Sequence, residues 1–590
     1  MMASIIQSCI QRSRRGVLSS IRFQSSVIFS SYPEKSYEVT TNSWYHKPNV
    51  RSFCTQQISS PVDATVKKNE IDEIINSWGK NPFHPDIGPF IDERLKECNL
   101  RNVCHMMRLL GKRPGILKST SFKEKLPAFV SQLQYLDKKK FTFPRLSSIA
   151  YGLQCIDERV DDHVKILSII TKKMILASNE RTATSKEVCN MLMGLQRNRA
   201  SREETKSYLR ALTSVIEKSK DEFTPQAVSN SLLGLRSMNS NTVEVLNLLK
   251  ALERKVLNCK QELSAQDLGS AFSGLRNMNG NNPGVRSMLS ALIPKVINMK
   301  DELDSQSVGY IMHSLHWMSS DHAVVLELIT ALEPKIRKCE ILGGKALSQT
   351  VYGLRSMSSD SPVVLSLVSV IESKFRDNKI ILGGAEVCDA LAGLTSLSCN
   401  HAVVRSLVSA ITQKVVECDT VFMAKDLSSG ILGLRSMSSE HPEVKALVSA
   451  LAVKLTKSTL QFSFIEVNRV MSGINSMSSK DVEVRNILSA ILPKLITCRG
   501  AIDPISMTNV LHSFRNMSID HEEVRLLIVE LIPKVRSMQS LFTARQMERV
   551  NKGLNALTST HPDVILMQQA VTSKVMIGGR DGVRVTKKEE

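Results

Sequence analysis

The stretch GLRSMSSEHPEV, from Gly433 to Val444, recurs along the chain in slightly altered form. The chain reads GLTSLSCNHAVV from Gly393 to Val404 and GINSMSSKDVEV from Gly473 to Val484, so these copies lie 40 residues apart. With the first residue of each copy as an anchor, the gaps between anchors are 39 to 42 residues. The anchors are Gly111, Gly152, Gly194, Gly234, Gly274, Ser314, Gly353, Gly393, Gly433, Gly473, Ser513 and Gly553. Such a period predicts a solenoid, in which each unit buries its apolar face only against its neighbours.

Each repeat predicts two helices joined by a polar segment. Leu427, Ile431 and Leu434 recur at helical spacing before that segment, and Val444 and Leu447 begin a second apolar stripe after it. The fold class we expect is therefore all-α, an α-solenoid of about twelve helical hairpins of ~40 residues each. Four prolines fall late in second helices and predict a kink, or a break into a short third helix. They are Pro294, Pro334, Pro493 and Pro533.

The anchor position is glycine in ten copies and serine in two. Glycine inside a helix costs about 1 kcal/mol relative to alanine, so its recurrence needs a physical reason. A reversed φ is one reason, but serine would tolerate that conformation poorly. We therefore expect the anchor to be small because neighbouring first helices approach each other closely there.

Composition favours an anionic partner. The 590 residues include 77 Lys+Arg and 57 Asp+Glu, which gives a formal net charge of +20, and such a field attracts nucleic acid or an anionic membrane surface. No apolar run is long enough to span a bilayer, so we expect no membrane span. Several of the 12 cysteines recur 25 residues after an anchor, which is typical of buried, reduced thiols that pack as small hydrophobes. These are Cys259, Cys339, Cys418 and Cys498.

The N-terminal segment differs from the repeats. It carries spaced arginines such as Arg12 and Arg22, many serines and no acid before Glu34, which is typical of an organellar transit peptide. The sequence RSFCT at 51–55 resembles a mitochondrial processing site, so we expect a mitochondrial location, with the plastid as the alternative. The predicted organisation is a transit peptide or disordered segment at 1–60, a linker and N-terminal cap at 61–96, the solenoid at 97–575 and a charged disordered tail at 576–590.

Two columns of the first helix vary between repeats while their frame stays nearly constant. They lie four residues and one residue before the anchor, opposite the apolar stripe, and favour side chains that donate and accept hydrogen bonds. Reading one base per repeat requires such variation, although drift on a solvated face produces it too. The candidate base-reading residues are Ser148, Tyr151, Asn190, Asn230, Ser270, Tyr310, His313, Gln349, Tyr352, Asp389, Ser429, Arg469, Asn509, His512 and Arg549.

Two basic columns are candidates for phosphate contacts. Arginines recur two residues after the anchor, at Arg236, Arg276, Arg355, Arg435 and Arg515. Lysines recur 21 residues after it, at Lys255, Lys295, Lys335, Lys374, Lys414, Lys454, Lys494 and Lys534. A run of cations in register suggests a track for phosphates. The alternative is that the lysines have a structural role. A lysine near a helix C-terminus interacts favourably with the helix dipole, and its aliphatic stem covers apolar surface.

The segments FTPQAVSNSLLGLRSM, from Phe223 to Met238, and ELSAQDLGSAFSGLRNM, from Glu262 to Met278, resemble the first helix of octotricopeptide repeats. The resemblance implies a nucleus-encoded organellar protein that binds specific transcripts in processing, stabilisation or translation. The family's proline-rich PPPEW-like signature appears only as fragments such as HPEV. We expect the segment 576–590 to be a short tail and not a nuclease-like domain, so the resemblance extends to RNA binding and not to cleavage.

No catalytic motif emerges from the sequence. HExxH, GxxxxGK[ST], GxSxG and dinucleotide fingerprints are all missing from it, so we expect no enzyme, cofactor or metal site. The predicted partner is single-stranded organellar RNA, bound by a monomer on a basic concave face, with other RNA-processing or ribosomal proteins as further partners. The rival hypothesis is a protein-binding scaffold or assembly factor of the HEAT or armadillo kind.

Overall fold

The described residues come from a computed structural model, and they belong to the second of two compact units, Asp63–Glu590. They are residues 64–80, 87–113, 121–138, 141–377, 379–498, 500, 502–557 and 560–575. The predicted transit peptide at 1–60 and the predicted tail at 576–590 lie outside them.

The described residues form 26 α-helices, which alternate between two layers. The first helices of the hairpins, here called A helices, are α2 (Ala64–Lys80), α4 (Leu100–Lys112), α6 (Phe143–Gly152), α8 (Ser185–Met193), α10 (Pro225–Leu233), α12 (Ala265–Leu275), α14 (Ser305–Ser314), α16 (Gly344–Tyr352), α18 (Gly384–Gly393), α20 (Ala424–Leu432), α22 (Phe464–Gly473), α24 (Pro504–His512) and α26 (Ala544–Leu554). The second helices, here called B helices, are α3 (Ile87–Arg94), α5 (Phe122–Tyr135), α7 (Asp161–Ala177), α9 (Glu203–Lys218), α11 (Val243–Asn258), α13 (Pro283–Asn298), α15 (Ala323–Lys338), α17 (Pro362–Asp377), α19 (Ala402–Glu417), α21 (Pro442–Lys457), α23 (Val482–Thr497), α25 (Glu522–Arg536) and α27 (Pro562–Thr572). Short 3-10 turns follow several A helices, among them η4 (Leu315–Trp317) and η5 (Gly353–Ser356).

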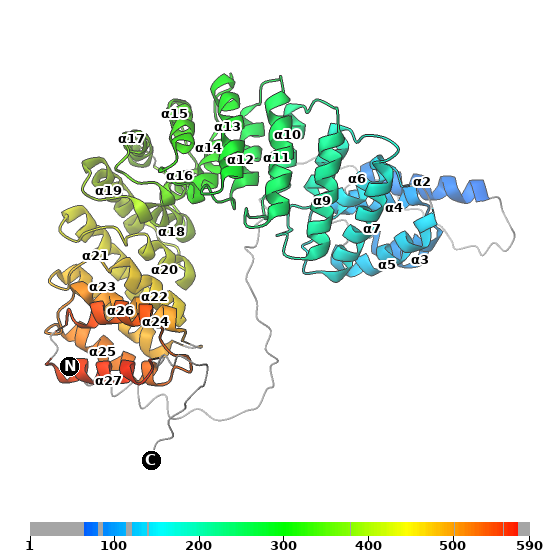
Figure 1. Cartoon of the computed structure of the whole chain (residues 1–590). Coiled ribbons are helices and arrows are strands. Elements are labelled where there is room, and N and C mark those ends of the chain that lie inside the picture. The colour runs from blue at the N-terminus through cyan, green and yellow to red at the C-terminus, as the bar shows by residue number, and fades with distance from the viewer. Residues whose placement is uncertain are drawn as a thin grey trace, which may run out of the picture. The chain divides into compact units, whose positions relative to one another are not determined.

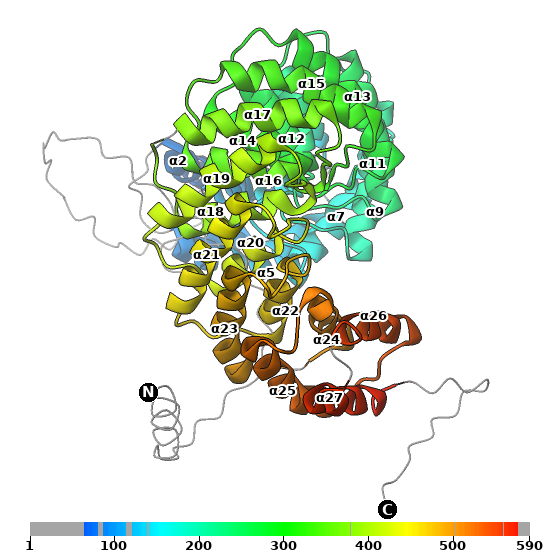
Figure 2. The same cartoon turned by 90° about the vertical axis from the view of Figure 1, so that its left-hand side faces the viewer.

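Helices of one kind pack against their own kind in the neighbouring hairpins. Each A helix contacts the A helices before and after it, and each B helix contacts the adjacent B helices. Figure 1 shows the even-numbered A helices α14 to α22 on the inner side of this stack and the odd-numbered B helices α13 to α23 on the outer side. Figure 2 shows α13, α15 and α17 side by side. Helices α2 and α3 stack on α4 and α5 in the same way, ahead of the predicted repeats. The predicted fold class, an all-α solenoid of helical hairpins, is confirmed.

The anchor glycines mark the closest approach between A helices. A Cβ added at Gly274 would lie 2.0 Å from the carbonyl oxygen of Leu232, and one added at Gly433 would lie 2.0 Å from that of Leu391. The backbone of Gly194 has φ of −60°, an ordinary helical value, so close packing and not a reversed φ selects glycine. The prediction that these residues are small for packing reasons is confirmed.

The polar residues after the anchor bond one repeat to the next. The side chain three residues after the anchor donates to the backbone carbonyl two residues after the preceding anchor. The pairs are Asn277 with Arg236 (2.8 Å), Ser356 with His316 (2.6 Å), Ser396 with Arg355 (2.8 Å), Ser436 with Thr395 (2.7 Å) and Ser476 with Arg435 (2.8 Å). A second ladder runs from the backbone N–H five residues after an anchor to the serine six residues after the preceding anchor, as from Ser398 to Ser359 (2.8 Å). The polar segment after the anchor recurs because its side chains provide hydrogen-bond partners for backbone N–H and C=O groups of the adjacent repeat.

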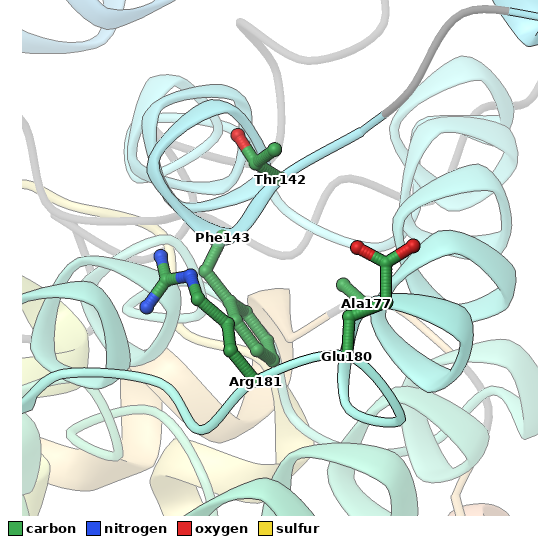
Figure 3. Close-up of a pocket in the computed structure, with 5 residues that line it drawn as sticks. All are labelled: Thr142, Phe143, Ala177, Glu180 and Arg181. Atoms are coloured by element: carbon green, nitrogen blue, oxygen red, sulfur yellow. The ribbon is translucent and has the colours of Figure 1, made fainter.

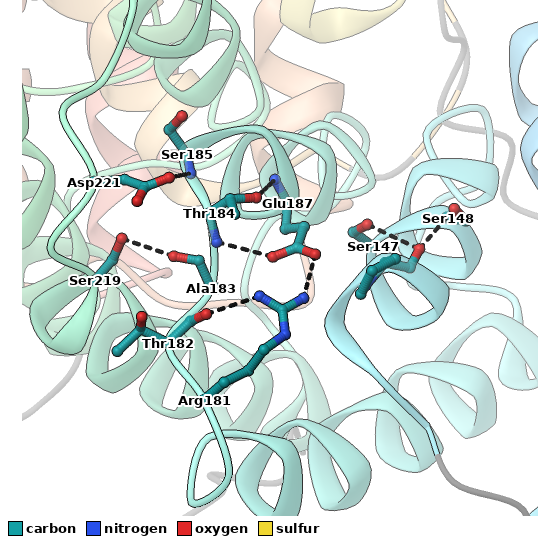
Figure 4. A network of polar contacts seen from close by, with 11 residues as sticks. Ser147, Ser148, Arg181, Thr182, Ala183, Thr184, Ser185, Glu187, Ser219 and Asp221 are labelled. Atoms are coloured by element: carbon teal, nitrogen blue, oxygen red, sulfur yellow. Dashed lines mark hydrogen bonds and ion pairs between the residues drawn. The ribbon is translucent and has the colours of Figure 1, made fainter.

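Several A helices start at a side-chain cap that the repeat supplies. At α8, the Glu187 N–H donates to the Thr184 hydroxyl and the Glu187 carboxylate accepts from the Thr184 N–H, which forms a capping box. Figure 4 shows this box beside two bonds from the next repeat, from the Ser219 hydroxyl to the Ala183 carbonyl (2.8 Å) and from the Ser185 N–H to Asp221 (3.1 Å). Stacking and capping are therefore coupled at this edge of the stack.

The late prolines do not break the B helices. α13 runs through Pro294 and α23 runs through Pro493, each as one helix. The carbonyl that each proline leaves without a donor belongs to an exposed residue, Ser290 or Ser489, so water can satisfy it. The predicted break into a third helix is therefore wrong.

Candidate nucleic-acid interface

Four columns form one continuous ridge on the solvent side of each A helix. They lie eight, four and one residues before the anchor and two residues after it, and we call them the A-helix strip in the repeats anchored at Gly152 to Gly553. Helical spacing of three to four residues brings these positions onto one face. In α10 they are Gln226, Asn230 and Leu233, followed by Arg236, and all four are exposed or half-buried.

The candidate base-reading residues all lie on this strip. Arg549 is exposed and the others are half-buried between adjacent A helices. Some already have partners, because the Ser148 and Ser429 hydroxyls each donate to a carbonyl of their own helix at 2.8 Å. His512 reaches the next repeat, with Nδ1 lying 3.1 Å from the Arg549 carbonyl oxygen. The structure thus places the predicted columns along one surface, and whether they read bases stays a prediction.

The most exposed column of the strip escaped the sequence analysis. Eight residues before the anchor, in the first turn of each A helix, the side chains are exposed in all repeats from Gly152 to Gly553. They are Pro144, Lys186, Gln226, Gln266, Gln306, Lys345, Ala385, Lys425, Ile465, Ile505 and Arg545. The signal that could have revealed them is the same helical spacing extended one turn towards the N-terminus.

The arginine column lies on the same strip as the base-reading candidates. Arg435 and Arg515 are exposed, and Arg276 and Arg355 are half-buried. The Arg276 Nε donates to the Arg236 carbonyl oxygen at 3.3 Å, and burial, followed by the charge of Arg236, lowers the pKa of Arg276. The guanidinium groups occupy the adjacent Gly234 and Gly274 repeats and then every second repeat, at Arg355, Arg435 and Arg515, where they can contact phosphates of a strand at intervals.

Asp389 is the one acid in the four columns of the strip. Burial, followed by the charges of Asp426 and Glu386, raises its pKa to about 6 against the opposing effect of Lys345. The remaining charged positions of the strip are Lys or Arg. The charged side chains of the strip are therefore basic apart from this one carboxyl group, and apolar side chains such as Ile465 and Ile505 lie between them.

The lysine column has a different position. Its ammonium groups donate to the carbonyl of the residue that directly follows the preceding B helix, as from Lys335 to Met299 (3.0 Å), Lys374 to Cys339 (2.6 Å) and Lys454 to Cys418 (2.6 Å). The Lys454 Nζ also lies 5.7 Å from the ring centroid of Phe422. Lys414 is buried and the other predicted members are half-buried on B helices. The structural alternative accounts for this column, so we leave its lysines out of the interface.

Thiols, possible metal ligands and surface pockets provide no further candidate for the interface among the described residues. Every cysteine among the described residues is a free thiol, and burial raises the pKa of Cys189 to about 11. Within the described ranges, no group of three or more His, Cys, Asp or Glu side chains could hold a metal ion. A surface pocket of about 430 Å³ beside Phe143 contains Glu180 and Arg181 (Figure 3), with the Arg181 guanidinium 5.2 Å from the Phe143 ring. None of the residues that line it belongs to the strip.

No helix in the described part of the chain has the length and apolarity needed to cross a bilayer.

Comparison with known proteins identifies no sequence family. No protein-family model and no curated protein matches the chain. Among solved structures, a crystal complex of SYS-1 with POP-1 is 11% identical with a TM-score of 0.24 and covers 85% of this chain and 94% of that one. The pentatricopeptide repeat protein PPR10 in complex with an 18-nt PSAJ RNA element is also 11% identical, with a TM-score of 0.23 and 87% of each chain covered. TM-scores this low support no inference from either protein about what this chain binds. By its own architecture, the chain is a helical-repeat protein.

Proposed function

We propose that this protein binds single-stranded RNA along the A-helix strip. The observation that carries the proposal is the charge of that surface, where Asp389 is the one acid in the four columns and every other charged side chain is Lys or Arg. A strand held there would place its phosphates on the arginine column and its bases near the variable columns. At about one base per repeat, the footprint would be roughly ten to twelve nucleotides.

The mechanism we propose is occupancy, without catalysis. A bound strand is shielded from exonucleases, remodelled or presented to other proteins, which corresponds to stabilisation, processing or translation. The octotricopeptide-like motifs and the arginine-rich N-terminal segment support an organellar RNA, with the mitochondrion preferred over the plastid.

The test is selection of a random single-stranded RNA pool by the full chain at physiological salt, followed by sequencing of the retained RNA. Enrichment of a motif of about ten nucleotides is expected, and the motif should change when Asn230→Ala or Arg469→Ala replaces the wild type. Affinity should fall steeply with salt, because phosphate contacts release counterions. Absence of RNA binding at low salt would reject the proposal.

A second candidate, a protein-binding scaffold, has one observation in its favour. Equivalent apolar side chains in three consecutive inter-repeat loops are exposed, namely Ile341 (72%), Ile381 (67%) and Val421 (77%). An apolar edge of this kind suits a protein partner. If the chain is a scaffold, the triple change of these residues to Ser should abolish capture of its partner and leave any RNA binding intact.

A further inference from the structure

At one place along the A-helix strip, aromatic rings on the strip and directly beside it gather around a guanidinium group. We call it the central cluster, and it comprises His313, His316, Trp317, Tyr352 and Arg355. His313 and Tyr352, from adjacent A helices, are stacked with ring centroids 5.1 Å apart and an interplanar angle of 13°. His316 lies 5.0 Å from the Tyr352 ring and 5.4 Å from the Trp317 ring, measured between centroids.

The two histidines in the cluster are neutral rings at physiological pH. Burial, followed by the charge of His316, lowers the pKa of His313 to about 3, and burial lowers that of His316 to about 4. Arg276, Arg355 and Lys345 contribute to these shifts. The cluster therefore offers aromatic faces, and the positive charge there comes from the guanidinium and ammonium groups around it.

Trp317 is placed where the fold favours a small polar residue. It lies three residues after its anchor, and the equivalent positions from the Gly234 repeat to the Ser513 repeat carry Ser or Asn. Those side chains donate to the preceding repeat, as Ser356 donates to the His316 carbonyl oxygen at 2.6 Å. Trp317 instead leaves its side chain 50% exposed. An exposed indole in place of a bonding serine points to a ligand that stacks.

Cations flank these rings. The Arg355 guanidinium donates to the Tyr352 hydroxyl at 3.0 Å and lies 5.7 Å from the centre of that ring, and Arg276 precedes it in the arginine column. Aromatic faces beside guanidinium groups are complementary to a ligand that is both flat and anionic, which describes a nucleotide.

We propose that the central cluster is a base-stacking site, where one nucleobase of the bound RNA stacks on the exposed Trp317 indole, which the His316 and Tyr352 rings support, while its flanking phosphates meet Arg276 and Arg355. This inference rests on the proposed RNA binding. It adds a fixed anchoring point near the middle of the strip, independent of base identity because every base has a π-face.

The test compares the full wild-type chain with W317S and with W317S/Y352L. Serine restores the side chain that the neighbouring repeats use at this position, and leucine is the equivalent residue in the Gly234 and Gly433 repeats, so both variants should fold. Binding is measured by fluorescence anisotropy with a labelled 20-nucleotide RNA of mixed sequence. Heparin serves as a polyanion without bases, and adenosine monophosphate as a free nucleotide.

We expect W317S to weaken RNA binding about 10-fold and the double variant about 100-fold. The dependence of affinity on salt and the affinity for heparin should stay unchanged in W317S, because no phosphate contact is removed. In W317S/Y352L the Arg355 guanidinium also loses the Tyr352 hydroxyl to which it donates, so only W317S isolates stacking from charge. RNA should also quench tryptophan emission in the wild type and less in W317S, since the other two tryptophans, Trp44 and Trp78, are present in both proteins and Trp78 is buried against Phe90.

Three results would overturn the inference. Wild-type affinity in both variants would show that RNA binds elsewhere on the strip, or that the cluster serves a protein partner, while leaving the proposed function standing. Saturation of the Trp317 quench by adenosine monophosphate at the concentrations that suffice for RNA would assign the site to a free nucleotide. Failure of the wild type to bind any RNA would remove the proposed function and this inference together.

Discussion

The arginine and lysine columns are both basic and share one period, yet they differ in what surrounds them. The lysines lie on B helices, where groups such as the Lys454 ammonium bond a carbonyl at the end of the preceding B helix. The arginines lie on the strip, where Arg435 and Arg515 are exposed to solvent. A charge that recurs in every repeat can therefore serve either the stacking of repeats or a ligand, and its surroundings decide which.

The strip arginines give the largest expected effect. The triple variant R355A/R435A/R515A should lose about 100-fold in RNA affinity, because three charge-assisted contacts disappear. The slope of log affinity against log salt should become shallower by about 2. Binding isotherms over a salt series measure both quantities, with thermal unfolding as the stability control. An unchanged slope would place the phosphates away from this column.

The anchor glycine that precedes Arg435 gives the next largest effect. Gly433→Ala should destabilise the fold by about 3 kcal/mol, because the new Cβ would meet the Leu391 carbonyl oxygen at 2.0 Å. Gly343→Ala is the matched control, since its Cβ would lie 3.5 Å from the nearest atom, the Ser305 hydroxyl. Denaturant unfolding measures both variants. Equal stability of the two would contradict the close approach of A helices.

The lysine column should affect stability and not RNA affinity. Lys454→Met removes the hydrogen bond to the Cys418 carbonyl (2.6 Å) and should lower the free energy of unfolding by about 2 kcal/mol. Lys250→Met, at an exposed position of α11, changes the net charge equally and should change stability by less than about 0.5 kcal/mol. Both variants should bind RNA alike. A selective loss of affinity in Lys454→Met would return the lysines to the interface.

Asp389 gives the smallest effect, and it depends on pH. Its folded pKa of about 6 lies above the ordinary value, so the ionised carboxyl destabilises the fold above pH 6, and this cost is relieved as pH falls from 6 towards 4. The charged form also repels phosphate. Asp389→Asn should therefore raise RNA affinity about threefold at pH 8 and leave it unchanged at pH 5. Anisotropy titrations at both pH values check this, and a gain that persists at pH 5 would exclude titration of Asp389 as its cause.

Much of the fold follows from local pattern. Period, apolar spacing and the small anchor predict stacked hairpins, and Gly274 and Gly433 are packed against the preceding A helix as that pattern requires. The local pattern did not predict that the B helices continue through their late prolines. Pro294 and Pro493 are tolerated because the carbonyl that each leaves unbonded is on an exposed residue. That exposure is a property of the packed layer.

The candidate site was predicted only in part, because helical spacing predicts which positions share a face but not which side chains of different repeats meet. The columns four and one residues before the anchor lie on the strip, but the exposed first-turn column with Lys186 and Lys345 was missed. The stacking of His313 on Tyr352 joins side chains from different repeats, so no single helix pattern contains it.

The sequence by itself determined the repeat, its two helices, the small anchor and the basic balance, because each depends on spacing within one unit and on composition. Only the tertiary structure decided which cations bond a neighbouring backbone and which face solvent, as the contrast between Lys374 and Arg435 shows. The physical reason is that each unit is completed by the next one. Partners 35 to 41 residues away along the chain become adjacent only when the hairpins stack.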